Sequence, residues 1–312
     1  MSSDYKAVRY LFFCYMLFSF AVCENGKKLN VYNWLFTIGL CSAIYVFYII
    51  LTVDGKKIKP LAGLYLLLYI IYLIAVQTDK MYKYMKIYHG QTSAVSTAAV
   101  TIAVFIVFVL YDNTDITRLY LPLSAMIILL LSVVTVLNFD KVSRCNLALN
   151  SNEIKLTGNI ILFDYIVPFI IITNTCKNVN RKKAIGFILK SWRIISVITI
   201  LCFMCLSGNL LYSISPLQAV FQIISTNLIR NYDALFNYLL YFSYFAALIL
   251  LFTAYKRIKS DFEYTGKWDL LLTIPFLMTG LAESYYISVI AEIIGVLAIF
   301  FGKEDFKYNE KN

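Results

Sequence analysis

The sequence predicts an all-α polytopic membrane protein, and three observations lead to this fold class. Hydrophobic residues make up 60% of the 312-residue chain and charged residues only 15%, whereas soluble globular proteins carry about 25% charged residues. Ten apolar blocks are each close to the roughly 20 residues that a helix needs to cross a bilayer. The short loops between them carry most of the lysines and arginines. The predicted spans are 8–23, 31–53, 60–77, 93–111, 119–139, 157–176, 184–207, 232–255, 268–283 and 284–301.

The net charge of +10 is explained by membrane topology rather than by nucleic-acid binding. When both termini are placed in the cytoplasm, the inside segments hold nearly twice as many lysines and arginines as the outside loops. The positive-inside rule predicts this bias. Lys190 and Arg193, near the start of span 184–207, are expected to extend toward the cytoplasmic face along their aliphatic stems. We therefore predict a multi-pass protein with cytoplasmic termini, a lipid bilayer as its surroundings and no nucleic-acid partner.

The chain lacks the residue sets of metal-dependent or nucleophilic catalysis. Its single histidine, His89, is expected in the loop after span 60–77, so a zinc site or a histidine-based triad lacks its parts. Cys202 and Cys205 form a Cys-x-x-Cys inside an apolar run, which favours packing over redox chemistry. A membrane-embedded enzyme or polysaccharide-handling protein is the least favoured class, because the sequence shows neither paired carboxylates nor a basic catalytic cluster on a large outer loop. We expect no enzymatic activity, no metal and no cofactor.

The polar stretch 138–155 divides the chain into two groups of five spans, 1–139 and 157–301, followed by a cytoplasmic tail at 302–312. Inverted repeats of five plus five spans are a common transporter architecture. Their ligand sites lie near the bilayer midplane, at helices that are interrupted. The sequence thus predicts one transmembrane domain built from two five-helix repeats.

Span 157–176 contains a candidate for such an interruption, whereas the corresponding first span, 8–23, has neither a glycine pair nor a proline. Pro168 cannot donate a backbone hydrogen bond, and its ring crowds the carbonyl of Asp164, four residues earlier. An ionisable group inside a span costs about 2.5–3.5 kcal/mol on insertion and tends to face a cavity or a partner. Either Asp164 lines a ligand cavity with Phe163 and Pro168, or it reaches water near the helix end. Glu292, inside the last span, is either a proton-relay residue or a neutral group bonded to a neighbouring helix.

A short amphipathic helix is predicted before span 232–255. Ser215, Pro216 and Gln218 combine an N-cap, a proline at the first helical position and a capping box. The apolar residues that follow share one helical face and are Leu217, Val220, Phe221, Ile224 and Leu228. Arg230 and Asp233 then have the i, i+3 spacing of an ion pair at a helix start. This pair either anchors the surface helix to the next span or acts as a gate.

Two segments carry a resemblance to a known family. The sequence Phe-Asp-Tyr-Ile-Val-Pro-Phe at 163–169 is similar to an aromatic, acidic, Pro-Phe sixth helix, and Pro216–Phe236 is similar to a proline-led surface helix with an Arg-x-x-Asp-x-x-Phe ending. Over residues 157–260 the chain thereby resembles the spore-germination permeases. These are the GerAB-type membrane subunits of germinant receptors, in the amino acid–polyamine–organocation transporter superfamily.

This resemblance implies a LeuT-like fold in which spans one, three, six and eight enclose the ligand site. Tyr65, Tyr69 and Tyr72 fall on one face of span three. Residues Asn237, Tyr241 and Tyr244 fall on one face of span eight. Such stripes usually serve packing, and Tyr69 and Tyr241 are the first of these residues expected to line the site, with Asn237 beside them.

The function that the resemblance implies is binding of a small nutrient germinant, with an amino acid as the leading ligand class. The chain would then signal germination from the spore inner membrane, together with a large A-type subunit and a lipoprotein C-type subunit. The alternative is a secondary transporter of the cell membrane for amino acids or related solutes. In that case Asp164 or Glu292 would be the carboxyl group that couples transport to protons.

Overall fold

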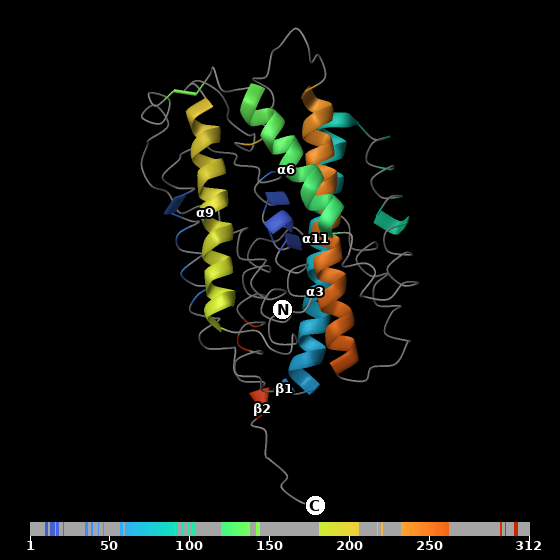
Figure 1. Ribbon diagram of the computed structural model, residues 1–312. Helices are drawn as coiled ribbons and strands as arrows, with labels where there is room; N and C mark the ends of the chain where they lie inside the picture. The colour runs from blue at the N-terminus through green and yellow to red at the C-terminus, as the bar shows by residue number, and fades with distance from the viewer. Residues whose placement is uncertain are drawn as a thin grey trace, which may run out of the picture. The chain divides into compact units, whose positions relative to one another are not determined.

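The computed structural model of the chain describes four long helices and one two-stranded antiparallel sheet (Figure 1). The helices are α3 (Pro60–His89), α6 (Tyr120–Leu137), α9 (Arg181–Cys205) and α11 (Tyr232–Asp261). The strands are β1 (Lys57–Ile58) and β2 (Lys303–Glu304). The residues that the structure describes are 10, 11, 13–15, 17, 18, 21, 35, 36, 39, 43, 46, 57, 58, 60–90, 92, 95, 99, 101–103, 120–137, 142, 143, 181–205, 217, 220, 232–261, 294, 297, 303 and 304.

The chain divides into two compact units, each assembled from three segments of sequence. The first unit comprises Met1–Tyr45, Thr114–Phe163 and Gly186–Ile249. The second comprises Val46–Asn113, Asp164–Ile185 and Leu250–Asn312. Helix α6 and most of α9 thus belong to the first unit and α3 to the second, whereas α11 contributes residues to both.

Helices α3 and α11 begin at the residues predicted, and α6 and α9 begin within about three residues of the predicted starts. The predicted end of α3 at residue 77 is wrong, because the helix continues to His89. His89 is therefore the last residue of a helix rather than part of a loop. The segment after residue 77 is polar but contains no glycine or proline before Gly90, whose φ of 83° suits the position that follows a helix.

Helices α3 and α11 are long and apolar enough to cross a membrane by length and composition, over Pro60–Lys86 and Leu235–Lys256. Every residue from Ala246 to Tyr255 in α11 is buried. Ten consecutive positions cover the whole circumference of a helix. This part of α11 is therefore an interior helix, as expected for a segment that is apolar on all sides.

The exposed face of α6 is apolar, whereas the exposed face of a helix at the surface of a soluble protein is usually polar. Ser124, Ile127 and Leu130 form its buried stripe, and the chain carries no charged residue between Tyr120 and Leu137. Its exposed large side chains are all apolar and are Leu121, Met126, Ile128, Leu129 and Val136. A helix that faces water presents charged and polar side chains on that side. The outer face of α6 has the composition expected for contact with hydrocarbon.

The exposed hydroxyl groups of α6 fit the same surroundings. Ser132 donates a hydrogen bond to the carbonyl of Ile128, and Thr135 donates one to the carbonyl of Leu131, each at 2.8 Å. Each hydroxyl is thus satisfied by the carbonyl four residues earlier on its own helix. Because hydrocarbon offers no hydrogen-bond partner, internal satisfaction of this kind is what a lipid-facing position requires.

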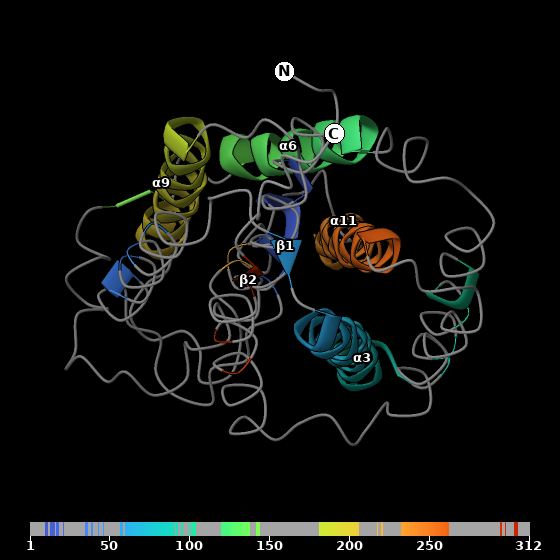
Figure 2. The ribbon, with the colours of Figure 1, turned by 90° about the horizontal axis from the view of Figure 1, so that it is seen from below.

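The first unit is held together by contacts between segments far apart in sequence. The rings of Phe18 and Tyr244 lie 5.3 Å apart between centroids, and both side chains are fully buried. The amide of Ser143 donates a 3.0 Å hydrogen bond to the carbonyl of Met204, one of the last carbonyls of α9, which lack partners within their helix. The C-terminal ends of α6 and α9 lie side by side in both views (Figures 1 and 2).

In the second unit, β1 and β2 pair antiparallel, with Lys57 opposite Glu304 and Ile58 opposite Lys303 (Figure 2). These strands were not predicted from the sequence. They join the loop before α3 to the predicted tail 302–312, and both of these segments are expected in the cytoplasm. The pairing therefore agrees with their placement on one side of the membrane.

Candidate functional site

A buried polar segment interrupts the apolar surface of α3. The helix is almost wholly apolar from Leu61 to Val76, and then Gln77, Thr78 and Asp79 follow in succession. All three side chains are buried. A carboxyl group without access to water needs a charged or hydrogen-bonding partner close by, so the surroundings of Asp79 determine what this segment can do.

Asp79 is paired with Lys83, one helical turn further along. The Nζ of Lys83 lies 2.9 Å from the Oδ2 of Asp79, and the exposed fractions of the two side chains are 32% and 2% respectively. An acidic residue four positions before a basic one is the favoured orientation in a helix. The hydroxyl of Thr78 is bound separately, since it donates to the carbonyl of Ile74 at 2.8 Å. The pair thus consists of an enclosed carboxylate and a lysine side chain that is partly exposed.

The ion pair continues the row of tyrosines that was predicted on this helix. Tyr65, Tyr69, Tyr72, Asp79 and Lys83 are separated by intervals of four, three, seven and four residues. Such intervals place side chains along one face of a helix. The rings of Tyr65 and Tyr69, and those of Tyr69 and Tyr72, are each 6.4 Å apart between centroids. We call these five residues the α3 stripe.

The depth of the ion pair along α3 matters if this helix crosses a membrane. Asp79 follows Pro60 by 19 positions, which corresponds to about 28 Å of helix. The hydrocarbon core of a bilayer is about 30 Å thick. If Pro60 lies at one border of the hydrocarbon core, the ion pair lies close to the opposite border.

The other predicted site residues that the structure describes lie in the first unit. Asn237 and Tyr241 are half-buried on α11, and the ring of Tyr241 stacks on that of Phe245 with centroids 6.3 Å apart. Tyr69, by contrast, belongs to the second unit. Asp233 is the second residue of α11, in agreement with its predicted place at a helix start. The predicted site residues outside the described part of the chain are Phe163, Asp164, Pro168, Arg230 and Glu292.

Sequence reasoning missed Asp79 and Lys83, because the polar residues after Val76 were read as a loop. A signal for them was present. The tyrosine row continues through positions 79 and 83 at helical intervals, and an Asp–Lys pair at i, i+4 is itself a helix-stabilising pattern. Extending the row would have placed both residues on the same helix face as Tyr69.

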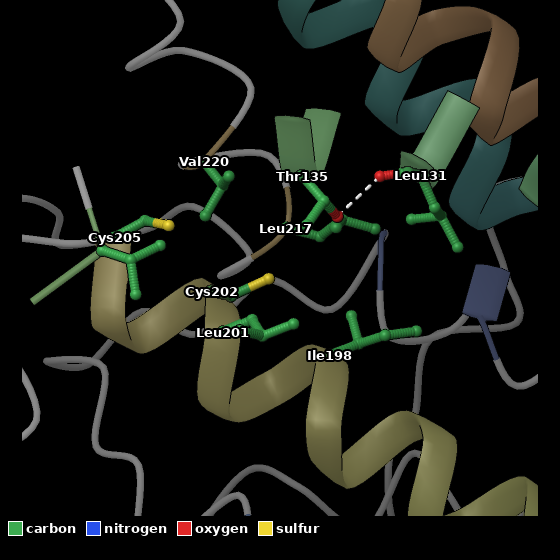
Figure 3. A pocket seen from close by; sticks show the side chains of 9 residues that line it. Leu131, Thr135, Ile198, Leu201, Cys202, Cys205, Leu217 and Val220 are labelled. Atoms are coloured by element: carbon green, nitrogen blue, oxygen red, sulfur yellow. Dashed lines mark hydrogen bonds between the residues drawn. The ribbon is translucent and has the colours of Figure 1, made fainter. Parts of the chain in front are cut away.

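A separate cavity of about 60 Å³ lies in the first unit (Figure 3). Four segments line it, namely α6, α9, the linker between them and the predicted amphipathic helix. The lining residues are Leu131 and Thr135 of α6, Val142 of the linker, Ile198, Leu201, Cys202 and Cys205 of α9, and Leu217 and Val220 of the amphipathic helix. Leu217 and Val220 are helical and buried, which confirms the predicted apolar face at these two positions. Figure 3 shows the thiol groups of Cys202 and Cys205 on the side of α9 that faces Leu217 and Val220.

The described parts of the chain hold no group of three or more His, Cys, Asp or Glu side chains placed to bind a metal ion. Neither Cys202 nor Cys205 forms a disulfide, and both are buried in the apolar cavity wall. The α3 stripe brings charge and aromatic surface together on one helix face. Comparison with protein-family models and with curated proteins finds no match to this chain.

Proposed function

We propose that this chain is a multi-pass helical membrane protein that binds a small zwitterionic solute, an amino acid in the first instance. The observation that carries this proposal is the pair of buried Asp79 and part-exposed Lys83, on a helix that is otherwise apolar enough to cross a bilayer. A buried carboxylate is costly unless it is paired, and a solute that enters from the side of the membrane nearest this pair would meet it first.

Membrane location is supported by α6 as well as by the lengths of α3 and α11. The outer face of α6 is apolar, and its exposed hydroxyl groups bond to their own helix. We propose ten spans in two groups of five, on the basis of the apolar blocks in the sequence. The termini are placed in the cytoplasm because of the lysine and arginine bias.

A zwitterion suits the ion pair because it carries both of the opposite charges. Its ammonium group can replace Lys83 on the carboxylate of Asp79, while its carboxylate binds the displaced Lys83. The exchange turns one internal ion pair into two pairs with the ligand and leaves the net charge of the site unchanged.

We propose, on the strength of the family resemblance, that this binding serves a germinant receptor in the spore inner membrane. The chain would act there with A-type and C-type partner subunits. A signal requires that the ligand bind one arrangement of the helices more tightly than another. Separation of Lys83 from Asp79 is a concrete difference between two such arrangements.

Secondary transport is the second candidate function, favoured by the same exchangeable pair. A carboxylate whose counter-ion alternates between lysine and substrate can serve a transport cycle as well as a sensor. Asp164 and Glu292 are the further carboxyl groups proposed for proton coupling. Uptake of labelled amino acids into vesicles separates the two functions, because robust proton-dependent flux requires transport and a pure sensor gives none.

The proposal is tested by binding of amino acids to the purified protein and to its Asp79→Asn and Asp164→Asn variants. Each amino acid is compared with its amide and its N-acetyl derivative, which lack one of the two charges. We expect wild type to prefer the zwitterion and Asp79→Asn to lose at least about tenfold in affinity, or about 1.4 kcal/mol. Lys86→Met is the matched control, since Lys86 is exposed on the same helix.

The two carboxyl variants distinguish two locations for the site. Loss of binding in Asp79→Asn alone would place the ligand at the α3 stripe. Loss in Asp164→Asn alone would place it at the proposed interruption of span 157–176. Unchanged binding by Asp79→Asn would contradict the proposed role of the ion pair.

A further inference from the structure

We propose that the cavity between α6 and α9 in the first unit is a binding site for the end of a lipid acyl chain. The inference rests on the proposed membrane location of α6 but is independent of the solute site on α3.

The wall of the cavity offers almost nothing to a polar occupant. Six of its nine lining residues are aliphatic, namely Leu131, Val142, Ile198, Leu201, Leu217 and Val220. The hydroxyl of Thr135 is already bonded to the carbonyl of Leu131 (Figure 3), and the two thiols are weak hydrogen-bonding groups. A buried water typically makes two to four hydrogen bonds, so a wall with so few free polar groups favours an apolar occupant.

The cavity shares residues with the apolar outer face of α6. Thr135 is exposed and Leu131 is half-buried, and both contribute to the cavity wall. Their neighbours on the outer face include Ile128 and Val136, which are exposed and apolar. If this face contacts hydrocarbon, the chains of the surrounding lipids already lie against the rim of the cavity. A bilayer acyl chain is therefore the occupant that the surroundings supply.

The volume of the cavity limits how much of the lipid acyl chain can enter. A cavity of about 60 Å³ is smaller than the 150 Å³ engineered cavity that binds benzene. It has room for the terminal few carbons of a chain and not for a whole amphiphile. Leu217 and Val220 form part of its wall, so a bound chain would connect α6 and α9 with the segment that precedes α11.

Photo-crosslinking of the full chain in phosphatidylcholine vesicles tests this site. One lipid carries a diazirine at the end of an acyl chain, and a control lipid carries the diazirine next to the headgroup. After illumination, the modified residues are mapped by mass spectrometry. We expect the end-labelled lipid to modify peptides that contain Cys202, Cys205, Leu217 or Val220, and the control lipid to leave them unmodified.

Two matched variants show whether the modification depends on the cavity. Val220→Phe fills the cavity and should abolish its cross-links, whereas Val197→Phe adds the same ring at an exposed position of α9 outside the lining and should preserve them. In both variants, continued labelling of Met126, Ile128 or Leu129 on the outer face of α6 reports that the protein is folded in the bilayer.

The labelling of α6 also separates the two proposals. Labelled α6 with an unlabelled cavity would overturn the acyl-chain site and leave the membrane location standing. Absence of label at both places would overturn the membrane location, and the acyl-chain site with it. Cavity labelling that persists in Val220→Phe would likewise overturn the acyl-chain site.

Discussion

The ion pair of α3 predicts that its two partners contribute unequally to stability. In Lys83→Met the remaining charge is the carboxylate of Asp79, whose side chain is 2% exposed. Removal of one partner of a fully buried pair costs at most about 3–5 kcal/mol, and because Lys83 is partly exposed we expect a smaller loss that still exceeds the loss in Asp79→Asn. In Asp79→Asn the remaining charge is the ammonium of Lys83, whose side chain is 32% exposed and can turn toward water. We expect this variant to lose about 1 kcal/mol, the scale of one net hydrogen bond.

The double variant, Asp79→Asn with Lys83→Met, removes both charges of the pair. With both charges removed, no ionised group is left buried, so the free energy of unfolding should return close to that of Asp79→Asn or rise above it. Lys86→Met controls for the loss of a lysine from the same helix and should change stability by less than about 0.5 kcal/mol. The measurement is an SDS titration of the purified protein in mixed micelles, followed by far-ultraviolet circular dichroism. Equal losses in the two single variants, or a larger loss in Asp79→Asn, would refute the reasoning.

Two further predictions test α6 and the core of the first unit. Leu129→Arg, in the middle of the outer face of α6, should reduce membrane insertion by about 2.5–3.5 kcal/mol, whereas Leu121→Arg at the helix start should cost much less, as measured by the inserted fraction in microsomes. Phe18→Ala should lower the free energy of unfolding by about 3–5 kcal/mol, because Phe18 is fully buried against Tyr244. Phe36→Ala, at a side chain that is 47% exposed, should cost less than about 1 kcal/mol in the same SDS titration, and equal losses would argue against the Phe18–Tyr244 contact as a core contact.

The helices that the sequence predicted well are those whose boundaries coincide with changes of polarity. Helix α6 lies within the predicted span 119–139, and α9 begins and ends within about three residues of the predicted 184–207. A helix that crosses hydrocarbon needs a long apolar run, and such a run is visible without any knowledge of tertiary structure. The start of α3 at Pro60 was predicted for the same reason.

The end of α3 was not predicted, because the helix continues beyond the point at which its sequence becomes polar. The segment after Val76 is polar enough to resemble a loop, yet its residues continue the helix, and Gln77 and Asp79 are buried. Burial by the rest of the fold is a tertiary effect that a local pattern does not report. The strands β1 and β2 were not predicted, because strands of two residues show no alternation of polar and apolar residues in the sequence.

The candidate site was likewise predicted only in part. The common face of Tyr65, Tyr69 and Tyr72 follows from helical spacing, and their ring contacts confirm it. Asp79 is recognised as a site residue only in the structure, which shows that it belongs to the same helix as the three tyrosines. The predicted residues Asp164 and Glu292 lie outside the described part of the chain, so their roles stay predictions.

The pairing of β1 with β2 imposes a parity rule on the topology of the chain. Because Ile58 lies opposite Lys303, these two residues occupy the same side of any membrane that the protein crosses. The polypeptide between them must then cross that membrane an even number of times, whatever the lengths of the individual spans. The rule is independent of the lysine and arginine distribution, and it excludes every arrangement in which the number of crossings between residues 58 and 303 is odd.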